Sequence, residues 1–175
     1  MVKMFLELLF YPGVIIHEFT HFLACVLLGV KVTKIKFGLK ESFVQHHDVH
    51  DWKTIIIAIA PFLLSNIIAV LGIWYAVEFR PEFYIFAIIL WLAVTVVFQS
   101  IPSKKDIENV DSKIGSIYRS ITKKHFLMQV PLFILNTTII IPLKLFTFFM
   151  SVFNKYQLLK IVLIVAVFQI GIWLA

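Results

Sequence analysis

The sequence contains a single cysteine and few charged residues, and both shortages exclude classes of protein. Cys25 cannot form a disulfide within the chain, and its apolar neighbours Leu23, Ala24, Val26 and Leu27 predict a small buried side chain. Only 15% of the residues are charged, whereas a soluble domain typically has about 25%. The composition therefore argues against both an internally cross-linked chain and an ordinary soluble domain.

Apolar residues take the place of the missing charge. They make up 61% of the 175 residues, against about 45–50% in a typical soluble domain, and the mean hydropathy is +0.95. These values predict a polytopic membrane protein embedded in a lipid bilayer. The net charge of +6 does not indicate a nucleic-acid partner, because the Lys and Arg residues cluster in loops between apolar runs, as the positive-inside rule predicts.

The apolar runs predict an all-α polytopic membrane protein with about five transmembrane helices, built as a single membrane domain over residues 1–175. The approximate spans are residues 4–29, 53–77, 83–101, 126–153 and 158–174. Pro12-Gly13 interrupts the first run, so either the helix is kinked there or residues 1–11 form a separate interfacial piece. We expect this run to be retained, because it is too long for a signal peptide.

Two polar loops, residues 30–52 and 102–125, separate these spans. In the first, Val and Ile alternate with Lys, which predicts a short β-hairpin with a turn near residues 38–42. The second predicts a short amphipathic helix. Residues 30–53 hold five Lys and residues 102–125 hold six Lys or Arg, whereas the loops expected on the other side hold one each. We therefore expect the basic loops to be cytosolic, in the plasma membrane of a prokaryote.

Three ionisable residues, His17, Glu18 and His21, lie within the first apolar run. At bilayer depth each costs about 2–3 kcal/mol or more unless a partner compensates it. On a helix, residues four apart differ by about 40° in direction, so both imidazoles lie on one face. This His-Glu-x-x-His pattern is that of a zinc-protease helix. We predict that His17 and His21 bind one zinc ion per chain and that Glu18 is the catalytic general base.

A catalytic zinc ion has three protein ligands, and the best candidate for the third is Asp106. This residue follows the third span at its cytosolic end, and the C-terminal end of the first span is cytosolic in the same topology. A re-entrant turn at Pro102 would bring the carboxylate inward. We therefore predict His17, His21 and Asp106 as the metal ligands.

Other polar residues are weaker candidates for a functional role. A second group of potential metal ligands lies in the first polar loop: His46, His47, Asp48, His50 and Asp51. A loop near the membrane surface accommodates such residues without a metal, so we interpret this group as solvated. Asn66, within the second span, either orients the substrate or simply bonds a neighbouring helix.

Three stretches of the sequence carry a family pattern. They are His17-Glu18-Phe19-Thr20-His21, Ala60-Pro61-Phe62-Leu63-Leu64-Ser65-Asn66, and Pro102 to Asp106. Together they resemble the site-2 protease family of intramembrane zinc metalloproteases. The second stretch lacks the Gly of the family's Ala-Gly-Pro-x-x-Asn pattern, and Ile107 stands where the family has a Gly after its Asp ligand. The resemblance implies a bundle around a zinc site that water reaches from the cytosol.

We therefore predict an intramembrane zinc metalloprotease that hydrolyses peptide bonds in or near transmembrane segments of membrane-protein or peptide substrates. The resemblance implies that the strands at 30–46 hold the substrate extended. The first alternative is a zinc-binding membrane protein without protease activity, such as a degenerate homologue with a scaffolding role. A metal transporter is less favoured, because the predicted fourth and fifth spans contain no carboxylate.

Overall fold

Helices make up most of the protein. The computed structural model describes residues 2–39, 41–47, 49–122, 134 and 136–175. In chain order, the elements are α1 (Val2–Leu27), β1 (Val32–Lys36), β2 (Phe43–His46), α2 (Asp51–Phe79), α3 (Phe83–Gln99), α4 (Lys104–Thr122), the π-helical turn η2 (Asn136–Ile140), α6 (Ile141–Lys155) and α7 (Gln157–Leu174). The two strands form an antiparallel hairpin directly after the first helix, so this part of the predicted fold is confirmed.

Several of the described helices are long and apolar enough to cross a membrane. Three segments meet this condition alone: Glu7–Leu27, Asp51–Phe79 and Thr138–Lys155. Helix α3 and the first part of α4 give a fourth candidate, bent by 45° at the break between them, and α7 is apolar but slightly shorter. The structure thus has three to four candidate spans, which indicates a multi-pass membrane protein.

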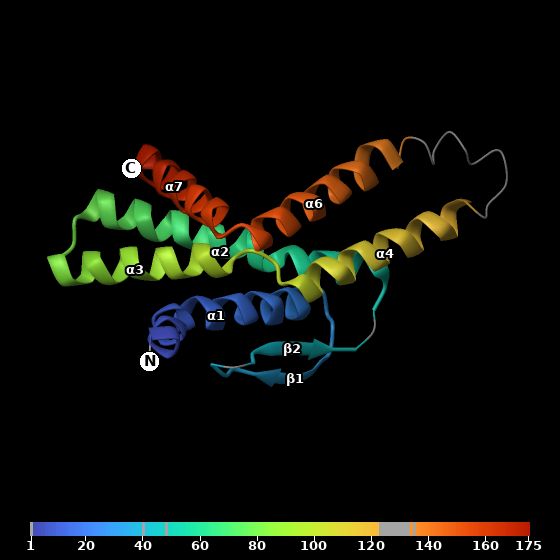
Figure 1. Ribbon diagram of the computed structural model, residues 1–175, viewed down its shortest axis with the longest axis horizontal. Helices are drawn as coiled ribbons and strands as arrows, with labels where there is room; N and C mark the ends of the chain where they lie inside the picture. The colour runs from blue at the N-terminus through green and yellow to red at the C-terminus, as the bar shows by residue number, and fades with distance from the viewer. Residues whose placement is uncertain (1, 40, 48, 123–133, 135) are drawn as a thin grey trace.

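Helix α2 is the longest element and runs through the middle of the molecule (Figure 1). Helices α1, α3, α4 and α7 all pack against it. The chain reverses after Phe79, so α3 and then α4 follow α2 in the opposite direction, and α6 and α7 return along another side (Figure 1). The break between α3 and α4 therefore lies in the interior of this arrangement, beside α1.

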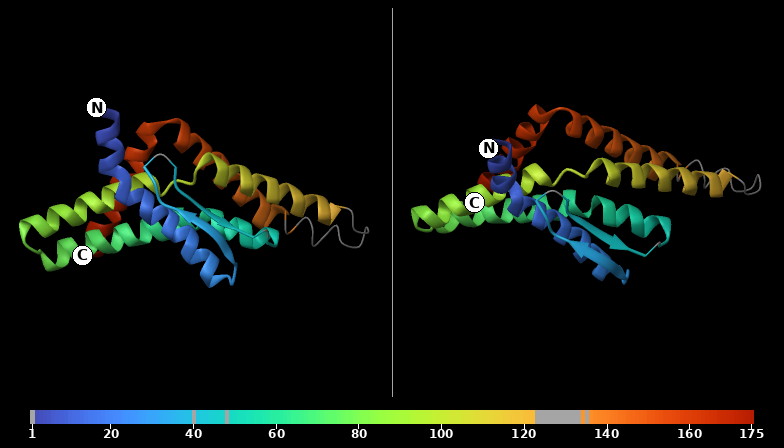
Figure 2. Two further views of the ribbon diagram at one scale, coloured as in Figure 1. Left: turned by 90° about the horizontal axis from the view of Figure 1, so that it is seen from below. Right: turned by 60° about the horizontal axis from the view of Figure 1, so that its bottom comes forward.

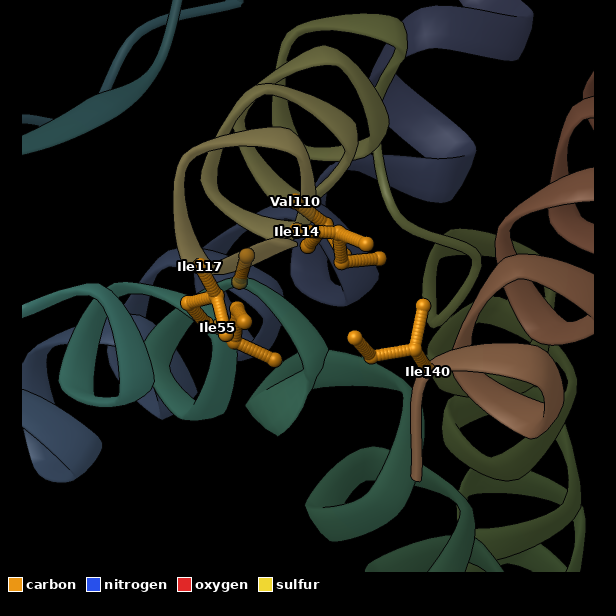
Figure 3. Close-up of a cluster of buried hydrophobic side chains, with 6 residues drawn as sticks. Ile55, Val110, Ile114, Ile117 and Ile140 are labelled. Atoms are coloured by element: carbon orange, nitrogen blue, oxygen red, sulfur yellow. The ribbon is translucent and has the colours of Figure 1, made fainter. Parts of the chain in front are cut away.

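An apolar cluster attaches α4 to the N-terminal half of α2. Ile55 of α2 packs with Val110, Ile114 and Ile117 of α4, and Ile140 of η2 completes the cluster (Figure 3). The three α4 side chains recur three or four residues apart, which places them on one helical face. Helix α4 is thus the amphipathic helix expected within 102–125, but at 19 residues it is not short. The cluster fixes α4 against the bundle and so fixes the position of its first turn.

Helix α1 is continuous but bent. Pro12 lies inside the helix, and Figure 2 shows the N-terminal part turned away from the rest. A proline within a helix removes one backbone hydrogen bond and its ring displaces the preceding turn, which produces a kink. Of the two alternatives for residues 1–11, the structure therefore has the kinked helix, and the candidate span begins at Glu7.

The residue after this proline permits a close crossing of α1 and α3. A Cβ atom added to Gly13 would lie 2.2 Å from the carbonyl oxygen of Thr95 and 2.6 Å from its carbonyl carbon. Both atoms belong to the backbone of α3, so they cannot move aside as a side chain would. Gly13 stands one helical turn before His17, and the close approach therefore brings the end of α3 within reach of that imidazole.

Substitution of Gly13 by Ala is expected to lower the free energy of unfolding by about 1–3 kcal/mol, because the two backbones must separate. The matched control is Gly115→Ala in α4, where an added Cβ meets no atom within 4 Å. There the higher helix propensity of Ala should raise stability by about 0.5–1 kcal/mol. Denaturant unfolding of both variants in the same detergent measures the two changes in the free energy of unfolding. If this free energy falls in both variants or rises in both, the close crossing is contradicted.

The hairpin lies beside α1, with β2 nearer to that helix than β1 (Figure 1). Ile35 pairs with Val44, and Lys36 pairs with Phe43. The turn falls at the predicted residues 38–42, where the Ser42 hydroxyl donates to the Gly38 carbonyl (2.9 Å) and accepts from the Gly38 N–H (3.1 Å). One edge of β2 is paired with β1, and Phe43, Val44 and His46 of β2 border a pocket that residues of α1 and α2 also line.

The fourth predicted span, residues 126–153, lies partly outside the described residues, which omit 123–133 and 135. Its described part begins with η2 and continues as α6 to Lys155. Helix α7 begins at Gln157, so the connection expected between the spans 126–153 and 158–174 is reduced to Tyr156. Lys155 remains helical because the backbone N–H of Tyr156 donates to the Val152 carbonyl at 3.0 Å, which completes the last turn of α6.

Candidate metal centre

The first two side chains of the site are imidazoles of α1. His17 and His21 are both buried, with 8% and 7% of their surfaces exposed, and their ring centroids lie 4.9 Å apart. The four-residue spacing places them on the same face of the helix, one turn apart. This face points into the bundle, towards the ends of α2 and α3 that pack there.

Each imidazole is held through Nδ1 by a backbone carbonyl of another helix. Nδ1 of His17 lies 2.7 Å from the carbonyl oxygen of Gln99, and Nδ1 of His21 lies 2.8 Å from that of Ile57. Because a carbonyl only accepts, Nδ1 is the donor in both hydrogen bonds, and in the neutral imidazole Nε2 then keeps its lone pair for a metal. This is the arrangement that orients a metal-binding histidine and fixes its tautomer.

The two carbonyls are available for identifiable reasons. Gln99 is the last residue of α3, where the final carbonyls of a helix have no partner within it. Ile57 lies inside α2, but the residue four positions later is Pro61, which has no N–H to donate back to it. A helix end and an internal proline thus leave two acceptors that the imidazoles use.

Asp106 stands opposite the histidines in the first turn of α4. One carboxylate oxygen, Oδ2, accepts from the Ser103 backbone N–H (2.9 Å) and from the Ser103 hydroxyl (2.6 Å), and the Asp106 N–H donates to the same hydroxyl (3.2 Å). This is a reciprocal capping arrangement at the start of a helix, formed by Ser-x-x-Asp. The other oxygen, Oδ1, lies 3.6 Å from Nε2 of His21, and Oδ2 lies 3.9 Å from Nε2 of His17.

These three side chains fit a divalent metal ion. One ligand atom from each of His17, His21 and Asp106 lies within 4.8 Å of the other two. Ligands at about 2.0–2.1 Å from a tetrahedral zinc ion are about 3.3–3.4 Å apart, so separations of 3.6 and 3.9 Å need only small adjustments. Two imidazole nitrogens and one carboxylate oxygen are also a donor set that zinc accepts. The residues present therefore fit a zinc ion with one coordination position open.

Glu18 lies beside this cluster and borders two pockets. It is 9% exposed. The β2 pocket, of about 120 Å³, also has His21, Val44, Thr54 and Asp106 in its walls. Glu18 is therefore placed between the metal-binding side chains and the strand that faces them.

The second cavity, the α7 pocket, has a volume of about 320 Å³. His17 and Glu18 of α1, Ser42 of the hairpin turn, and Asn154 and Lys160 of the α6–α7 region lie in its walls. Glu18, Ser42 and Ser103 border both pockets. The two pockets thus adjoin at Glu18, which one pocket reaches from the β2 side and the other from the α7 side.

Asn66 lies away from both pockets. Its Nδ2 donates to the Phe62 carbonyl of the same helix (2.5 Å) and to the Ser100 hydroxyl at the end of α3 (3.1 Å). Its Oδ1 is buried without a partner among the described residues. The structure therefore places Asn66 against the segment that presents Gln99 to His17, rather than in the cavities beside Glu18.

The second group of potential ligands is dispersed. His46 borders the β2 pocket, with its Nδ1 2.8 Å from the His47 carbonyl oxygen. Asp51 accepts from the Ser116 hydroxyl (2.5 Å) and pairs with Lys113 at 3.3 Å. Asp48 lies outside the described residues. Within the part of the chain that the structure describes, His17, His21 and Asp106 are the one group of three ligands close enough for a metal.

Three contributors to the site were not predicted from the sequence. Ser103 had a local signal, because Ser103-Lys-Lys-Asp106 matches the capping pattern that precedes a helix. The carbonyls of Ile57 and Gln99 had no such signal. Which imidazole meets which carbonyl depends on how α1 packs between α2 and α3.

Replacement of Pro61 by Ala is expected to weaken zinc binding by about 10–100-fold, the usual effect of losing the outer hydrogen bond of a ligand. The backbone N–H that this substitution introduces would compete with Nδ1 of His21 for the Ile57 carbonyl. The control is Pro142→Ala in α6, a second proline within a helix, where no imidazole of the proposed site is bound to the carbonyl four residues earlier. Titration of zinc against a competing chelator measures both, and equal affinities for the two variants would contradict this account of Pro61.

Comparison with known proteins supports the same region. A family model, DUF3267, described as "Putative zincin peptidase", matches residues 10–101, which is just over half of the 175 residues. The match contains α1 from Phe10 onward, with both histidines and Glu18, and also the hairpin, α2 and α3. No curated protein and no solved structure matches the chain.

Proposed function

The chain belongs to the DUF3267 family of zincin-type peptidases, and from this premise we propose that it is an intramembrane zinc metalloprotease of the site-2 protease type. It would hydrolyse peptide bonds in or near transmembrane segments of substrate proteins. The observation that carries this proposal is the convergence of His17, His21 and Asp106 beside Glu18 on an apolar helix. Intramembrane ionisable residues are costly and usually functional, and here three of them, His17, Glu18 and His21, lie in one candidate span.

In the proposed mechanism, His17 and His21 would hold one zinc ion through Nε2, and Asp106 would hold it through its carboxylate. When bound, zinc supplies a Lewis acid that polarises the scissile carbonyl and makes water acidic enough to ionise near neutral pH. The carboxylate of Glu18 takes the proton from the attacking water. It then donates that proton to the amine nitrogen of the leaving fragment, so Glu18 serves as base and then as acid.

The β2 strand supplies a surface for the substrate backbone. Phe43, Val44 and His46 of β2 border the β2 pocket, across from Thr54 and Ala58 of α2. A peptide in extended conformation could add to the unpaired edge of β2 through main-chain hydrogen bonds. Such pairing keeps the scissile bond exposed, whereas a helical transmembrane segment hides its carbonyls in its own hydrogen bonds. We therefore propose that the substrate unwinds locally before it is cut.

We assign Asn66 a positioning role in place of direct substrate contact. Its hydrogen bond to Ser100 fixes the end of α3. There the Gln99 carbonyl accepts a hydrogen bond from Nδ1 of His17. Substitution by Ala should therefore weaken zinc binding more than it changes the Michaelis constant for the substrate. A raised Michaelis constant with unchanged zinc affinity would favour substrate orientation instead.

We propose five membrane spans, formed by α1, α2, α3, α6 and α7, with the hairpin and α4 on the cytosolic side of a prokaryotic plasma membrane. Aromatic residues support the position of the α2–α3 turn at a membrane–water interface, where Trp and Tyr are enriched: Trp74, Tyr75, Phe79, Phe83 and Tyr84. The Lys and Arg residues of the loops set the proposed orientation. A cysteine at Arg80 should react with an impermeant maleimide from outside the cell, and one at Lys104 only after lysis. Cys25 is fully buried and gives little background. The reverse labelling pattern would invert the topology.

The proposed activity is tested with purified protein reconstituted in vesicles together with designed transmembrane peptides. We expect fragments, identified by mass spectrometry, whose formation stops with a zinc chelator and resumes when zinc is restored. A folded protein that retains zinc but yields no fragment with any peptide would favour the alternative, a zinc-binding membrane protein without protease activity.

A further inference from the structure

Lys160 is an unexpected charge in the wall of the α7 pocket. It lies in the first turn of α7, between Leu159 and Ile161, in a helix that is otherwise almost entirely apolar. A cation is unfavourable at this end of a helix, because the N-terminal backbone carries partial positive charge. Charged residues within apolar helices typically face a cavity and mark a functional path. Neither helix formation nor burial accounts for the presence of this lysine.

The surroundings of Lys160 leave its charge without a counter-ion. Its Nζ lies 4.7 Å from the centroid of the Phe98 ring, and the side chain is half-buried. Among the described residues, no carboxylate oxygen lies within 4.0 Å of this nitrogen, whereas Lys36, Lys104 and Lys113 each pair with a carboxylate. The aromatic ring compensates only part of the loss of water, by about 0.5–2 kcal/mol. An anion bound in the pocket would compensate for the rest of the hydration that the Lys160 ammonium group loses.

The pocket's own acidic residues are engaged elsewhere. Glu41 is held by Lys36 at 2.7 Å, and this hydrogen bond lowers the pKa of Glu41 below its usual range, so it stays ionised and paired. Glu18 faces the metal-binding side chains. The amide of Asn154 donates to the Pro102 carbonyl at 2.6 Å. Lys160 is therefore the one free cationic donor among the described residues that border this cavity.

We propose that Lys160 forms a subsite for a carboxylate of the substrate chain, so that the protein favours peptides with an acidic side chain at a fixed distance from the bond beside Glu18. This specificity rests on the proposed protease function. An ammonium group offers three donors and a full charge, which a carboxylate satisfies better than a neutral carbonyl does. The approach from the α7 pocket to Glu18 places this contact on one side of the scissile bond.

The test uses Glu18→Gln protein, which should bind peptides without cutting them. Fluorescence anisotropy compares dye-labelled transmembrane peptides that are identical except for Asp, Asn or Lys at one scanned position. At the favoured position, the Asp peptide should bind about tenfold more tightly than the Asn peptide. Adding Lys160→Met should bring that ratio close to one, and adding Lys160→Glu should favour the Lys peptide.

The matched control is Lys155→Met, five residues earlier, where the lysine lies over Tyr156 and does not border the α7 pocket. This change should leave the Asp-to-Asn ratio unaltered. A ratio of one at every position in the Glu18→Gln protein would overturn the subsite, as would equal loss of preference in Lys155→Met. Loss of the Asp preference on adding phosphatidylglycerol would assign Lys160 to lipid phosphate and also overturn it.

Cleavage of the same peptides by the unsubstituted protein separates this proposal from the protease function. If the Asp and Asn peptides are cut and bound equally, the subsite fails and the protease function stands. If no peptide is cut but the Asp preference in binding persists and depends on Lys160, the anion site stands and the protease function fails.

Discussion

Substitution of Glu18 by Gln is expected to lower the rate of peptide cleavage by about 10²–10⁴-fold, the usual contribution of a general acid–base group. The amide has nearly the shape of the carboxylate but can neither take the proton from water nor return it to the leaving amine. Zinc content should stay at the wild-type level, because the proposed ligands are His17, His21 and Asp106. Single-turnover cleavage in vesicles and metal analysis of the same preparation measure the two quantities.

Glu7→Gln is the matched control for this experiment. Glu7 lies on the same helix, and its side chain is exposed. The same chemical change there should leave both cleavage and zinc content at wild-type values. Full cleavage by the Glu18→Gln protein would remove Glu18 from the mechanism. Loss of zinc in that variant would instead make Glu18 a ligand.

Substitution of Asp106 by Ala should have the largest effect on the metal. It removes the only carboxylate among the three proposed ligands. The loss of zinc affinity should therefore be larger than about 100-fold, which is the upper end of the usual effect of losing an outer hydrogen bond. Asp106 also caps α4 through Ser103, so the variant should lose about 1 kcal/mol of stability even without zinc. Zinc titration and denaturant unfolding of the metal-free protein report these two roles separately.

Ser103→Ala separates the two roles of Asp106. It removes the hydroxyl that donates to Oδ2, while Oδ1 still faces Nε2 of His21. This variant should therefore share the loss of stability but keep most of its zinc affinity. If Ser103→Ala loses zinc as completely as Asp106→Ala, the carboxylate contributes through the helix cap and is not itself a ligand.

The features that the sequence predicted best are those set by local periodicity. The four-residue spacing of His17 and His21 requires only that the segment be helical, and the apolar run makes that conformation favourable. The alternation of Val and Ile with Lys in residues 30–37 predicted the hairpin for the same kind of reason. Asp106 was predicted from its place just after the third span, and the deduced membrane topology agreed with that choice without having been used to make it. The structure places its Oδ1 3.6 Å from Nε2 of His21.

The features that the sequence did not predict depend on contacts between distant segments. In the sequence, Pro61 stands out only within the stretch that resembles a family pattern, but in the structure this proline leaves the Ile57 carbonyl free for an imidazole 36 residues away. Asn66 carries no local sign that its partner is Ser100, 34 residues later. The need for a glycine at position 13 likewise becomes clear only from its close approach to the backbone of Thr95. In each case the deciding contact is set by the packing of α1, α2 and α3.

The most direct test of the account is the zinc content of the purified protein, measured beside the His17→Ala variant. Both are isolated in detergent, freed of loosely bound metal, and analysed by mass spectrometry of the elements, with circular dichroism to establish that each is folded. The account predicts one zinc ion per chain in the wild type and a large loss in His17→Ala. A folded wild type that binds no zinc when the metal is supplied would contradict the metal centre and the protease function that depends on it.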